Sequence, residues 1–189
     1  GRDEFKVRSL FEDLGLLGRP RFKFGEVCTD TIRADKQVLT SLLFNATQNA
    51  ITHGDAEGDV MVTAKLTDDL HSSDPSHKLR VTVHNLPGQN HAKLLAAVQA
   101  DPSIDSSDLF TWQADRLAKL EGMGAGASQS TFQGLDEMRV FASAFRPPAD
   151  MHLWVRPDGI LFELSLQVAL VTPTMAGAGQ AAASSGPPT

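Results

Sequence analysis

The sequence is poor in cysteine and contains no long hydrophobic run. Cys28 is the only cysteine among the 189 residues, so the chain can form no internal disulfide, which is typical of a protein from a reducing compartment. No apolar stretch approaches the roughly 20 residues that cross a bilayer, and no signal-peptide pattern occurs. We therefore expect a cytoplasmic protein whose domain makes no contact with a membrane.

Positive charge is also scarce. Lys and Arg number 17 against 23 Asp and Glu, which gives a formal net charge of −6 and a pI near 5.4. Because a phosphate backbone demands a basic surface, this balance argues against nucleic acid as the main partner. The hydrophobic content of 41% and the charged content of 21% are ordinary for a globular protein. The length leaves room for one domain of ordinary size with a core, plus tails.

Hydrophobic periodicity divides the chain into alternating helical and strand-like segments. The strand-like segments alternate apolar and polar residues, which predicts a sheet with one packed face and one wetter face. Together with the helical segments this indicates an α+β two-layer sandwich, in which helices cover one face of a mixed, mostly antiparallel sheet. The pattern predicts a helix-like stretch over 5–14, a β-like run over 21–27, a helix over 35–53, strands over 59–66 and 79–86, an irregular stretch over 89–127, a helix over 128–145, and strands over 151–155 and 160–170.

Composition further divides the chain into three parts. We expect residues 1–34 to be a lead-in helix or linker from an upstream domain, and residues 35–170 to form the main domain. Residues 171–189 are rich in Ala, Gly, Ser and Pro, with too few apolar side chains to order themselves, so we expect a disordered tail. The chain begins without an initiator methionine, and we expect it to be a piece of a longer protein.

The helix predicted over 35–53 carries three polar residues on one face. Asn45, Asn49 and His53 are spaced four residues apart, beside an apolar stripe that includes Leu39 and Leu42. Asparagine is a mediocre helix former, so two of them in a helix interior need partners or a function. An amide oxygen is a suitable ligand for a magnesium ion that carries nucleotide phosphates. The alternative is one buried structural asparagine and one surface asparagine.

The segment Asn45-Ala-x-x-Asn49-Ala-x-x-His53 resembles the N box of the GHKL ATPases, the superfamily of gyrase, the heat-shock chaperone, sensor histidine kinases and the mismatch-repair ATPase. It is most like the histidine-kinase branch, in which an acidic residue precedes a leucine-rich helix, as Asp35 does here. The resemblance implies the Bergerat (GHKL) fold over roughly residues 35–170, with ATP and Mg²⁺ as cofactors. It also implies that Asn49 binds magnesium, that Asn45 lines the phosphate end and that His53 lies near the nucleotide.

The end of the strand over 79–86 resembles a second GHKL motif, Asp-x-Gly-x-Gly, whose aspartate accepts a hydrogen bond from the adenine amino group. Aligning the alternating valines puts Asn85 at the aspartate position and leaves Gly88 as the surviving glycine, while Leu86 replaces a small residue. A shifted alignment puts His84 there instead. The amide of Asn85 can accept the same bond, more weakly than a carboxylate. The alternative interpretation is a plain strand end with Asn-Leu-Pro-Gly turn chemistry.

A glycine-rich segment before the helix over 128–145 resembles the second glycine box of the same superfamily. Gly122, Gly124 and Gly126 would let the main chain approach phosphate oxygens, and the resemblance implies a lid over the triphosphate. No Gly-Lys-Ser/Thr follows, so the segment is not a Walker loop, and it is not a Rossmann fingerprint because it does not directly follow a strand. Residues 109–112 are either a remnant of the phenylalanine-containing box upstream of the lid or an apolar anchor for a loop.

The resemblance implies the ATP-binding catalytic domain of a two-component sensor histidine kinase, a transferase. Such a domain donates the γ-phosphate of Mg-ATP to a histidine of an upstream dimerisation domain. The phosphoryl group then passes from this histidine to a response regulator. None of the six histidines lies in a His-Glu-x-x-x-Pro pattern, so we expect the phosphoacceptor histidine outside this chain. Two alternatives stay open: a non-catalytic GHKL-fold regulatory or interaction module with weak or no nucleotide binding, and a GHKL ATPase of another branch that acts as a conformational clamp.

Overall fold

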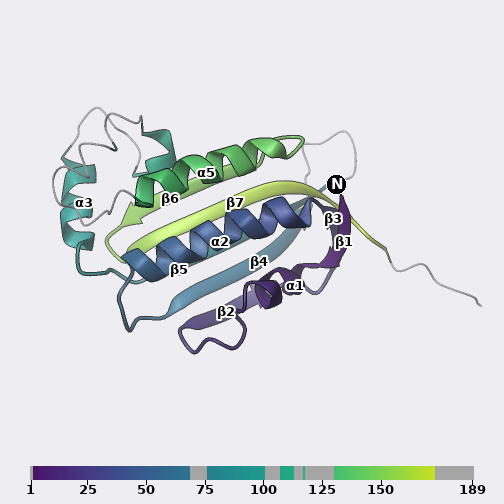
Figure 1. Ribbon diagram of the computed structural model, residues 1–189, viewed down its shortest axis with the longest axis horizontal. Helices are drawn as coiled ribbons and strands as arrows, with labels where there is room; N and C mark the ends of the chain where they lie inside the picture. The colour runs from purple at the N-terminus through teal and green to yellow at the C-terminus, as the bar shows by residue number, and fades with distance from the viewer. Residues whose placement is uncertain (1, 69–75, 101–106, 113–116, 118–129, 173–189) are drawn as a thin grey trace, which may run out of the picture.

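A mixed seven-stranded sheet organises the computed structural model, which describes residues 2–68, 76–100, 107–112, 117 and 130–172. Strands and helices are mixed along these residues (Figure 1). In chain order they are β1 (Asp3–Lys6), α1 (Val7–Asp13), β2 (Phe22–Val27), β3 (Thr31–Ala34), α2 (Lys36–His53), β4 (Val60–Asp68), β5 (His77–Asn85), α3 (His91–Gln99), the 3₁₀ turn η1 (Leu109–Thr111), α5 (Ser130–Ala144), β6 (Asp150–Arg156) and β7 (Gly159–Leu170).

The long strand β7 is the centre of the sheet. The strand order is β1-β3-β7-β5-β4-β2, and β6 pairs with β7 beside β3. One edge of β7 pairs with the whole of β5, whereas its other edge pairs with β6 near its start and with β3 near its end. Its 12 residues are long enough to serve both neighbours. Only β2 and β4 run parallel among these pairs, so the sheet is mixed and mostly antiparallel, as predicted.

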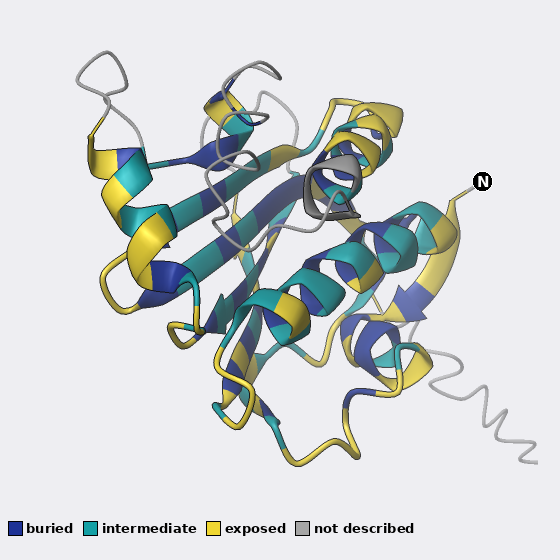
Figure 2. Cartoon of the chain, turned by 60° about the vertical axis from the view of Figure 1, so that its left-hand side comes forward, coloured by how far each residue is buried: buried dark blue, intermediate teal, exposed yellow. Residues whose placement is uncertain are grey.

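Strand alternation decides which face of the sheet is covered. Along β5 the side chains of Leu79, Val81 and Val83 are buried, whereas Arg80 between them is exposed. The helices α1, α2 and α5 lie over the buried face (Figure 1), and the buried residues continue from the strands onto the inner sides of the helices (Figure 2). The predicted α+β sandwich with helices on one face is confirmed.

Helix α2 forms where the sequence predicts it. The carboxylate of Asp35 accepts a hydrogen bond from the Val38 backbone N–H at 3.0 Å and so caps the first turn. The apolar stripe of the helix faces the sheet, and Leu39, Leu42 and Leu43 are fully buried. Burying a leucine side chain contributes about 1.5–3 kcal/mol, so this stripe fixes the rotation of α2 and therefore the direction of its polar face.

Residues 3–34 are part of the same sheet and core as the residues that follow them. β1 pairs with β3 and β2 pairs with β4, while Leu10 and Phe11 of α1 are fully buried. The structure therefore shows no break at residue 34, where the sequence placed the end of a lead-in. The helical spacing begins too early in the prediction, because Phe5 lies in β1. Residues two apart, such as Phe5 and Val7, fit a strand as well as a helix.

The stretch over 89–127 is more regular than the sequence predicts. It contains α3 and η1 among its described residues. Val98 of α3 and Leu109 of η1 are buried, so tertiary contacts support elements that are too short for a clear period. Within the described part of the chain, no helix is both long and apolar enough to cross a membrane. The predicted tail lies outside the described residues from residue 173 onward.

Candidate functional site

A cavity of about 240 Å³ lies where the C-terminal half of α2, the end of β5 and the start of α3 meet. This volume is just below the range of about 300–1,000 Å³ that is usual for small-molecule sites. Apolar side chains from several elements form most of the wall, and polar side chains form the rest. The polar lining consists of Asn49, Thr52, His53, Asn85, Gln89, Asn90 and His91.

The described lining of the cavity contains no Asp, Glu, Lys or Arg. Amides and imidazoles supply its polarity, and Leu94, Leu135 and Phe162 are among its apolar groups. Such a surface suits a flat, weakly polar ring system that makes a few directed hydrogen bonds. The described lining offers no cationic side chain to a phosphate chain.

Asn49 brings an amide to the cavity beside α5. Its Nδ2 lies 3.9 Å from the sulfur of Met138, a weak acceptor. Gly134 of α5 faces the same amide, and a methyl group at that position would still meet it only at ordinary contact distance. With the nitrogen directed at the sulfur, the amide oxygen is the acceptor left for a ligand or a cation.

His53 is the last residue of α2 and is partly buried in the cavity wall. Burial lowers its pKa below the ordinary value of 6.5, because the charged imidazolium loses solvation there. The side chain is therefore neutral at physiological pH. It contributes to the wall without placing a positive charge in the cavity.

The structure places Asn85, and not His84, in the cavity wall. Asn85 is only 4% exposed, and its Nδ2 donates to the Leu86 carbonyl oxygen at 3.2 Å. His84 belongs to the opposite face of the sheet, where its Nε2 lies 3.6 Å from an Asp158 carboxylate oxygen. Leu86 does not line the cavity and is 42% exposed, so its bulk leaves the ligand space open.

Gly88 closes the turn after β5 against the end of α2. A Cβ at Gly88 would collide with the carbonyl oxygens of His53 and Gly54. The same turn is tied down by a hydrogen bond from the Asp55 N–H to the Leu86 carbonyl oxygen at 3.1 Å. Gly88 therefore permits the close approach of two backbone segments at the edge of the cavity, although it is not itself part of the lining.

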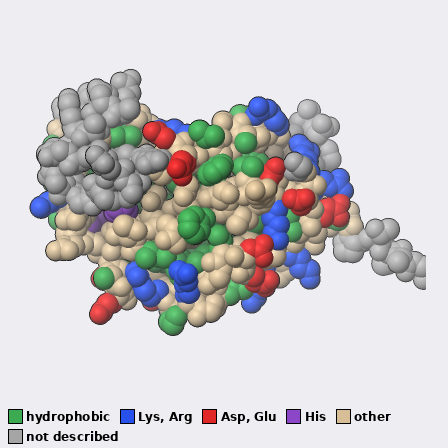
Figure 3. All heavy atoms as spheres, viewed as in Figure 1, with side chains coloured by type: hydrophobic (Ala, Val, Ile, Leu, Met, Phe, Trp, Pro, Cys, Tyr) green, Lys and Arg blue, Asp and Glu red, His purple; other side chains and the backbone are tan. Residues whose placement is uncertain are grey.

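Asn45 is not brought into the cavity. It lies one turn before Asn49, in an open groove between α2 and α5, and its Nδ2 donates to Glu137 at 3.4 Å. Phe44 and Phe141 border the same groove. Hydrophobic side chains are visible among polar ones on the face of the molecule seen in Figure 3. The phosphate role predicted for Asn45 stays a prediction. Gly122, Gly124 and Gly126 lie outside the described residues.

His91 lines this cavity as well, although no motif in the sequence indicated it. His91 begins α3 and is only 5% exposed. Its Nε2 lies 2.6 Å from the Arg156 carbonyl oxygen, while its Nδ1 has no hydrogen-bond partner within the described part of the chain. The signal in the sequence is weak, because one histidine at a helix start has many other uses.

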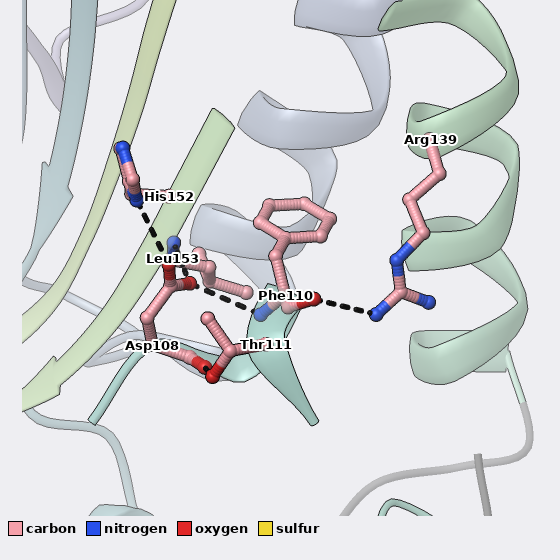
Figure 4. A network of polar contacts seen from close by, with 6 residues as sticks. All are labelled: Asp108, Phe110, Thr111, Arg139, His152 and Leu153. Carbon is pink, nitrogen blue, oxygen red and sulfur yellow. Dashed lines mark hydrogen bonds and ion pairs between the residues drawn. The ribbon is translucent and has the colours of Figure 1, made fainter. Parts of the chain in front are cut away.

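A buried carboxylate fixes the η1 side of the cavity (Figure 4). Asp108 is 3% exposed, and its Oδ1 accepts hydrogen bonds from the Phe110 N–H at 3.0 Å and the Leu153 N–H at 2.9 Å. Its Oδ2 lies 2.8 Å from the His152 Nδ1. Since Leu109 and Leu153 both line the cavity, Asp108 joins two apolar parts of its wall.

Arg139 of α5 holds η1 from the other side (Figure 4). Its guanidinium donates to the Phe110 carbonyl oxygen at 3.1 Å and lies 5.6 Å from the centre of the Phe110 ring. A longer contact of 3.4 Å reaches the Trp112 carbonyl oxygen. The buried side chains of Leu109 and Trp112 anchor this segment, which agrees with the interpretation of residues 109–112 as an apolar anchor.

Comparisons with solved structures identify the architecture around this cavity. The catalytic domain of the histidine kinase ThkA, in a nucleotide-free form, is 18% identical, with a TM-score of 0.54 over 88% of this chain and 96% of that one. The mycobacterial sensor histidine kinase MprB is 11% identical, with a TM-score of 0.54 over 90% and 100% of the two chains. The chain has the fold of a histidine-kinase catalytic domain.

A third similar structure is the Acinetobacter baumannii histidine kinase AdeS, which is 12% identical, with a TM-score of 0.51 over 91% of this chain and 68% of that one. No protein-family profile matches the sequence, and no curated protein matches it. Identities of 11–18% show a shared fold, and activity has to be argued from the site itself.

Proposed function

We propose that this chain is the ATP-binding catalytic domain of a two-component sensor histidine kinase. In this role it holds Mg-ATP and donates the γ-phosphate to a histidine in another domain. The observation that carries the proposal is the cavity, because Asn49, His53 and Asn85 all line it within a fold shared with histidine-kinase catalytic domains.

The residues of the cavity fit the base of an adenine nucleotide. The apolar side chains of Val83, Ile160 and Phe162 would cover a purine ring, and the Asn85 oxygen would accept from its amino group. This acceptor is neutral, so we expect weaker base recognition than a carboxylate would give.

Asn49 is the residue that we propose as the magnesium ligand. Its amide oxygen is a hard donor. The described residues contain no group of three or more His, Cys, Asp or Glu arranged to hold a metal ion, so phosphate oxygens and water would supply the other ligands. Bound Mg-ATP would supply the transferable phosphoryl group, while the residues of this chain bind and orient the nucleotide.

The proposal also assigns partners. The phosphoacceptor histidine would belong to an upstream helical dimerisation domain, and a response regulator would receive the phosphoryl group from it. We propose a cytoplasmic location, as for other steps that use ATP. Neither nucleic acid nor a membrane is expected to contact this domain.

One observation favours a second function, a non-catalytic regulatory or interaction module with the same fold. The described cavity lining is uncharged, and the adenine-contacting position holds Asn85 in place of an acid. A module of this kind would bind the base weakly or not at all, and would gain nothing from a triphosphate.

A thermal-shift experiment with Mg-ATP, Mg-ADP and adenosine separates the two functions. A ligand present at about 100 times its dissociation constant adds roughly 2.7 kcal/mol of stability. The kinase function predicts a clear rise in melting temperature with Mg-ATP that exceeds the rise with adenosine. No shift with any of the three, or an equal shift with Mg-ATP and adenosine, would favour the non-catalytic module.

The magnesium assignment is tested by Asn49→Ala. We expect this substitution to abolish magnesium-dependent nucleotide binding and to leave the fold intact, because Asn49 makes only a weak contact with Met138. Gln48→Ala, on the same helix turn but away from the cavity, is the matched control. Calorimetric titration with ATP, with and without Mg²⁺, gives the measurement. An unchanged affinity for ATP in the presence of Mg²⁺ in Asn49→Ala would contradict the assignment of Asn49 as the magnesium ligand.

A further inference from the structure

The side chain of His152 lies on the outer face of the sheet, directly behind the wall of the cavity. Along β6, Leu153 is buried and lines the cavity, whereas the preceding residue His152 points to the opposite face, where its side chain is 43% exposed. Solvent protons therefore reach His152 without entering the cavity. The ring and the η1 residue Phe110 lie on opposite sides of the Asp108 carboxylate (Figure 4).

Asp108 divides its two carboxylate oxygens between the cavity wall and His152. Its Oδ1 accepts from the N–H groups of Phe110 and Leu153 at 3.0 and 2.9 Å, and its Oδ2 lies 2.8 Å from the His152 Nδ1. A carboxylate can only accept, so Nδ1 carries a proton whether the ring is neutral or charged. A second proton, on Nε2, makes the contact an ion pair and strengthens its hydrogen bond.

Two further contacts hold η1, and neither changes its charge near neutral pH. Arg139 donates to the Phe110 carbonyl oxygen at 3.1 Å, and the Val155 N–H donates to the Ser107 carbonyl oxygen at 2.9 Å. A guanidinium stays protonated and a backbone amide does not titrate, whereas histidine is the side chain that changes charge in this range. The contact of His152 with Asp108 therefore responds to protons where these two do not.

Other charged or titratable groups surround His152 on its own strand and on the elements beside it. They are Glu163 of β7, Arg80 of β5, Asp150 and Arg156 of β6, and His91 of α3, which contacts the Arg156 carbonyl oxygen. Glu163 is opposite His152 in the strand register, and Arg80 lies 3.7 Å from its carboxylate. Asp108 lies within hydrogen-bond distance of the ring, so a proton on His152 acts first on Asp108.

We propose that His152 is a positioning residue, whose protonation favours the arrangement of η1 and β6 that forms the ligand cavity. This inference rests on the proposed function. A nucleotide that packs on Leu109 and Leu153 favours the same arrangement as the proton does, so the two bind with positive coupling. Mg-ATP binds more tightly when His152 is charged, and bound Mg-ATP favours the charged ring by the same factor.

Trp154 reports the charge of His152. The two rings are stacked, with their centroids 4.6 Å apart and 8° between their planes, and a protonated imidazole quenches indole fluorescence on contact. A pH titration of tryptophan fluorescence therefore follows His152, and His152→Gln identifies this part of the signal, since Trp112 also emits. We expect saturating Mg-ATP to move the midpoint of the titration to higher pH. An unchanged midpoint with nucleotide bound overturns the inference.

Calorimetric titration with Mg-ATP at several pH values measures the same coupling from the side of the ligand. Between about pH 6 and pH 8.5 we expect the affinity of the unmodified protein to fall about threefold relative to that of His152→Gln. The glutamine can still donate to Asp108 but cannot become charged. Because His53 is present in both proteins, its titration in the cavity wall cancels from the comparison.

Two further variants separate the charge of His152 from the loss of a histidine. His152→Arg keeps a positive charge at every pH of the series, so at high pH it should bind Mg-ATP about as tightly as the unmodified protein does at low pH. His77→Gln removes a partly exposed histidine paired with Asp68. It is the matched control and should keep the full pH dependence.

The outcomes distinguish the inference from the proposed function. Binding of Mg-ATP with the same pH dependence in His152→Gln and in the unmodified protein overturns the inference alone. Absence of binding at every pH overturns the proposed function and the inference with it. If the His152 variants fail to fold, the fluorescence midpoint of the unmodified protein with and without Mg-ATP still decides.

Discussion

At the scale of single residues, Asn85 has two opposing effects on its surroundings. Its amide donates a second hydrogen bond to the Leu86 carbonyl oxygen, which also accepts from the Asp55 N–H, and a carboxylate could not donate this bond. A carboxylate would, however, be the stronger acceptor for an amino group. The asparagine therefore favours the stability of the unliganded fold at the expense of affinity for the proposed nucleotide.

We expect Asn85→Asp to tighten ATP binding about tenfold, if charge assistance is worth roughly 1.4 kcal/mol. The exposed position of Leu86 means that the base can reach the new carboxylate. The unliganded protein should melt at a lower temperature, because a buried carboxylate then faces the Leu86 carbonyl oxygen. Titration calorimetry and thermal melting measure the two effects. A lower melting temperature without tighter binding would support the non-catalytic module.

His53 makes stability depend on pH in a defined direction. Its pKa is lowered by burial in the folded protein, while in the unfolded chain it stays near 6.5. As the pH falls below about 6.5, the unfolded chain binds the proton first, so the free energy of unfolding decreases until the folded pKa is reached. At higher pH His53 is neutral in both states and does not change the free energy of unfolding.

We therefore expect the melting temperature to fall less steeply between pH 7.5 and pH 5.5 in His53→Gln than in the unmodified protein. Melting curves across this range measure the slope, and His77→Gln controls for the general effect of losing a histidine. The same slope in His53→Gln and in the unmodified protein would show that the His53 environment contributes nothing.

At the scale of elements, the Asp108 side chain joins η1 to the sheet beside a backbone hydrogen bond from the Val155 N–H to the Ser107 carbonyl oxygen at 2.9 Å. Asp108 accepts from two backbone N–H groups, on Phe110 and Leu153, and contacts His152. The apolar residue Leu109 is placed in the cavity wall by these contacts. Hydrogen bonds between Asp108 and backbone N–H groups therefore hold η1 at the site, and no recognisable sequence motif marks it.

Asp108→Ala should lower the free energy of unfolding by roughly 2–4 kcal/mol, because it leaves buried N–H groups without an acceptor. Asp108→Asn keeps the acceptor oxygen and should cost less than half as much. Denaturant unfolding compares the two variants, and nucleotide affinity should follow the same order, because Leu109 and Leu153 line the cavity. Equal losses in both variants would show that the carboxylate oxygen is not the feature that matters.

At the scale of the whole molecule, the main question is where the folding unit begins. Residues 3–34 supply three strands to the sheet, and Leu10, Phe11 and Ile32 are fully buried. Losing one large core side chain costs about 3–5 kcal/mol, and loss of this whole segment would exceed the typical stability of a domain, about 5–15 kcal/mol. We propose that the folding unit includes residues 3–34.

A chain that starts at residue 35 should therefore fail to fold cooperatively. A chain that ends at residue 172 should retain the melting transition of the full sequence, since the described sheet and core are complete within it. Circular dichroism melting of both fragments measures this. A cooperative transition in the fragment 35–189 would restore the predicted boundary at residue 34.

The sequence by itself determined the elements that have a clear period and the direction of the polar face of α2. The alternation in β5 and β7 predicted the buried face of the sheet, and Asp35 with the leucine stripe predicted the start and rotation of α2. These features follow from local geometry, in which the chain's own spacing decides which side chains share a face. The resemblance to the N box also depends on spacing alone.

Only the tertiary structure decided which of these polar residues meet. Asn49 reaches the cavity and Asn45 does not, although both lie on the same face of α2, because β5 and α3 line the cavity near Asn49, whereas α1 and α5 line the groove near Asn45. It also brought His91 beside the Arg156 carbonyl oxygen, 65 residues away. Which polar side chains share the cavity depends on segments that lie far apart along the chain, and spacing along the sequence carries no information about such contacts.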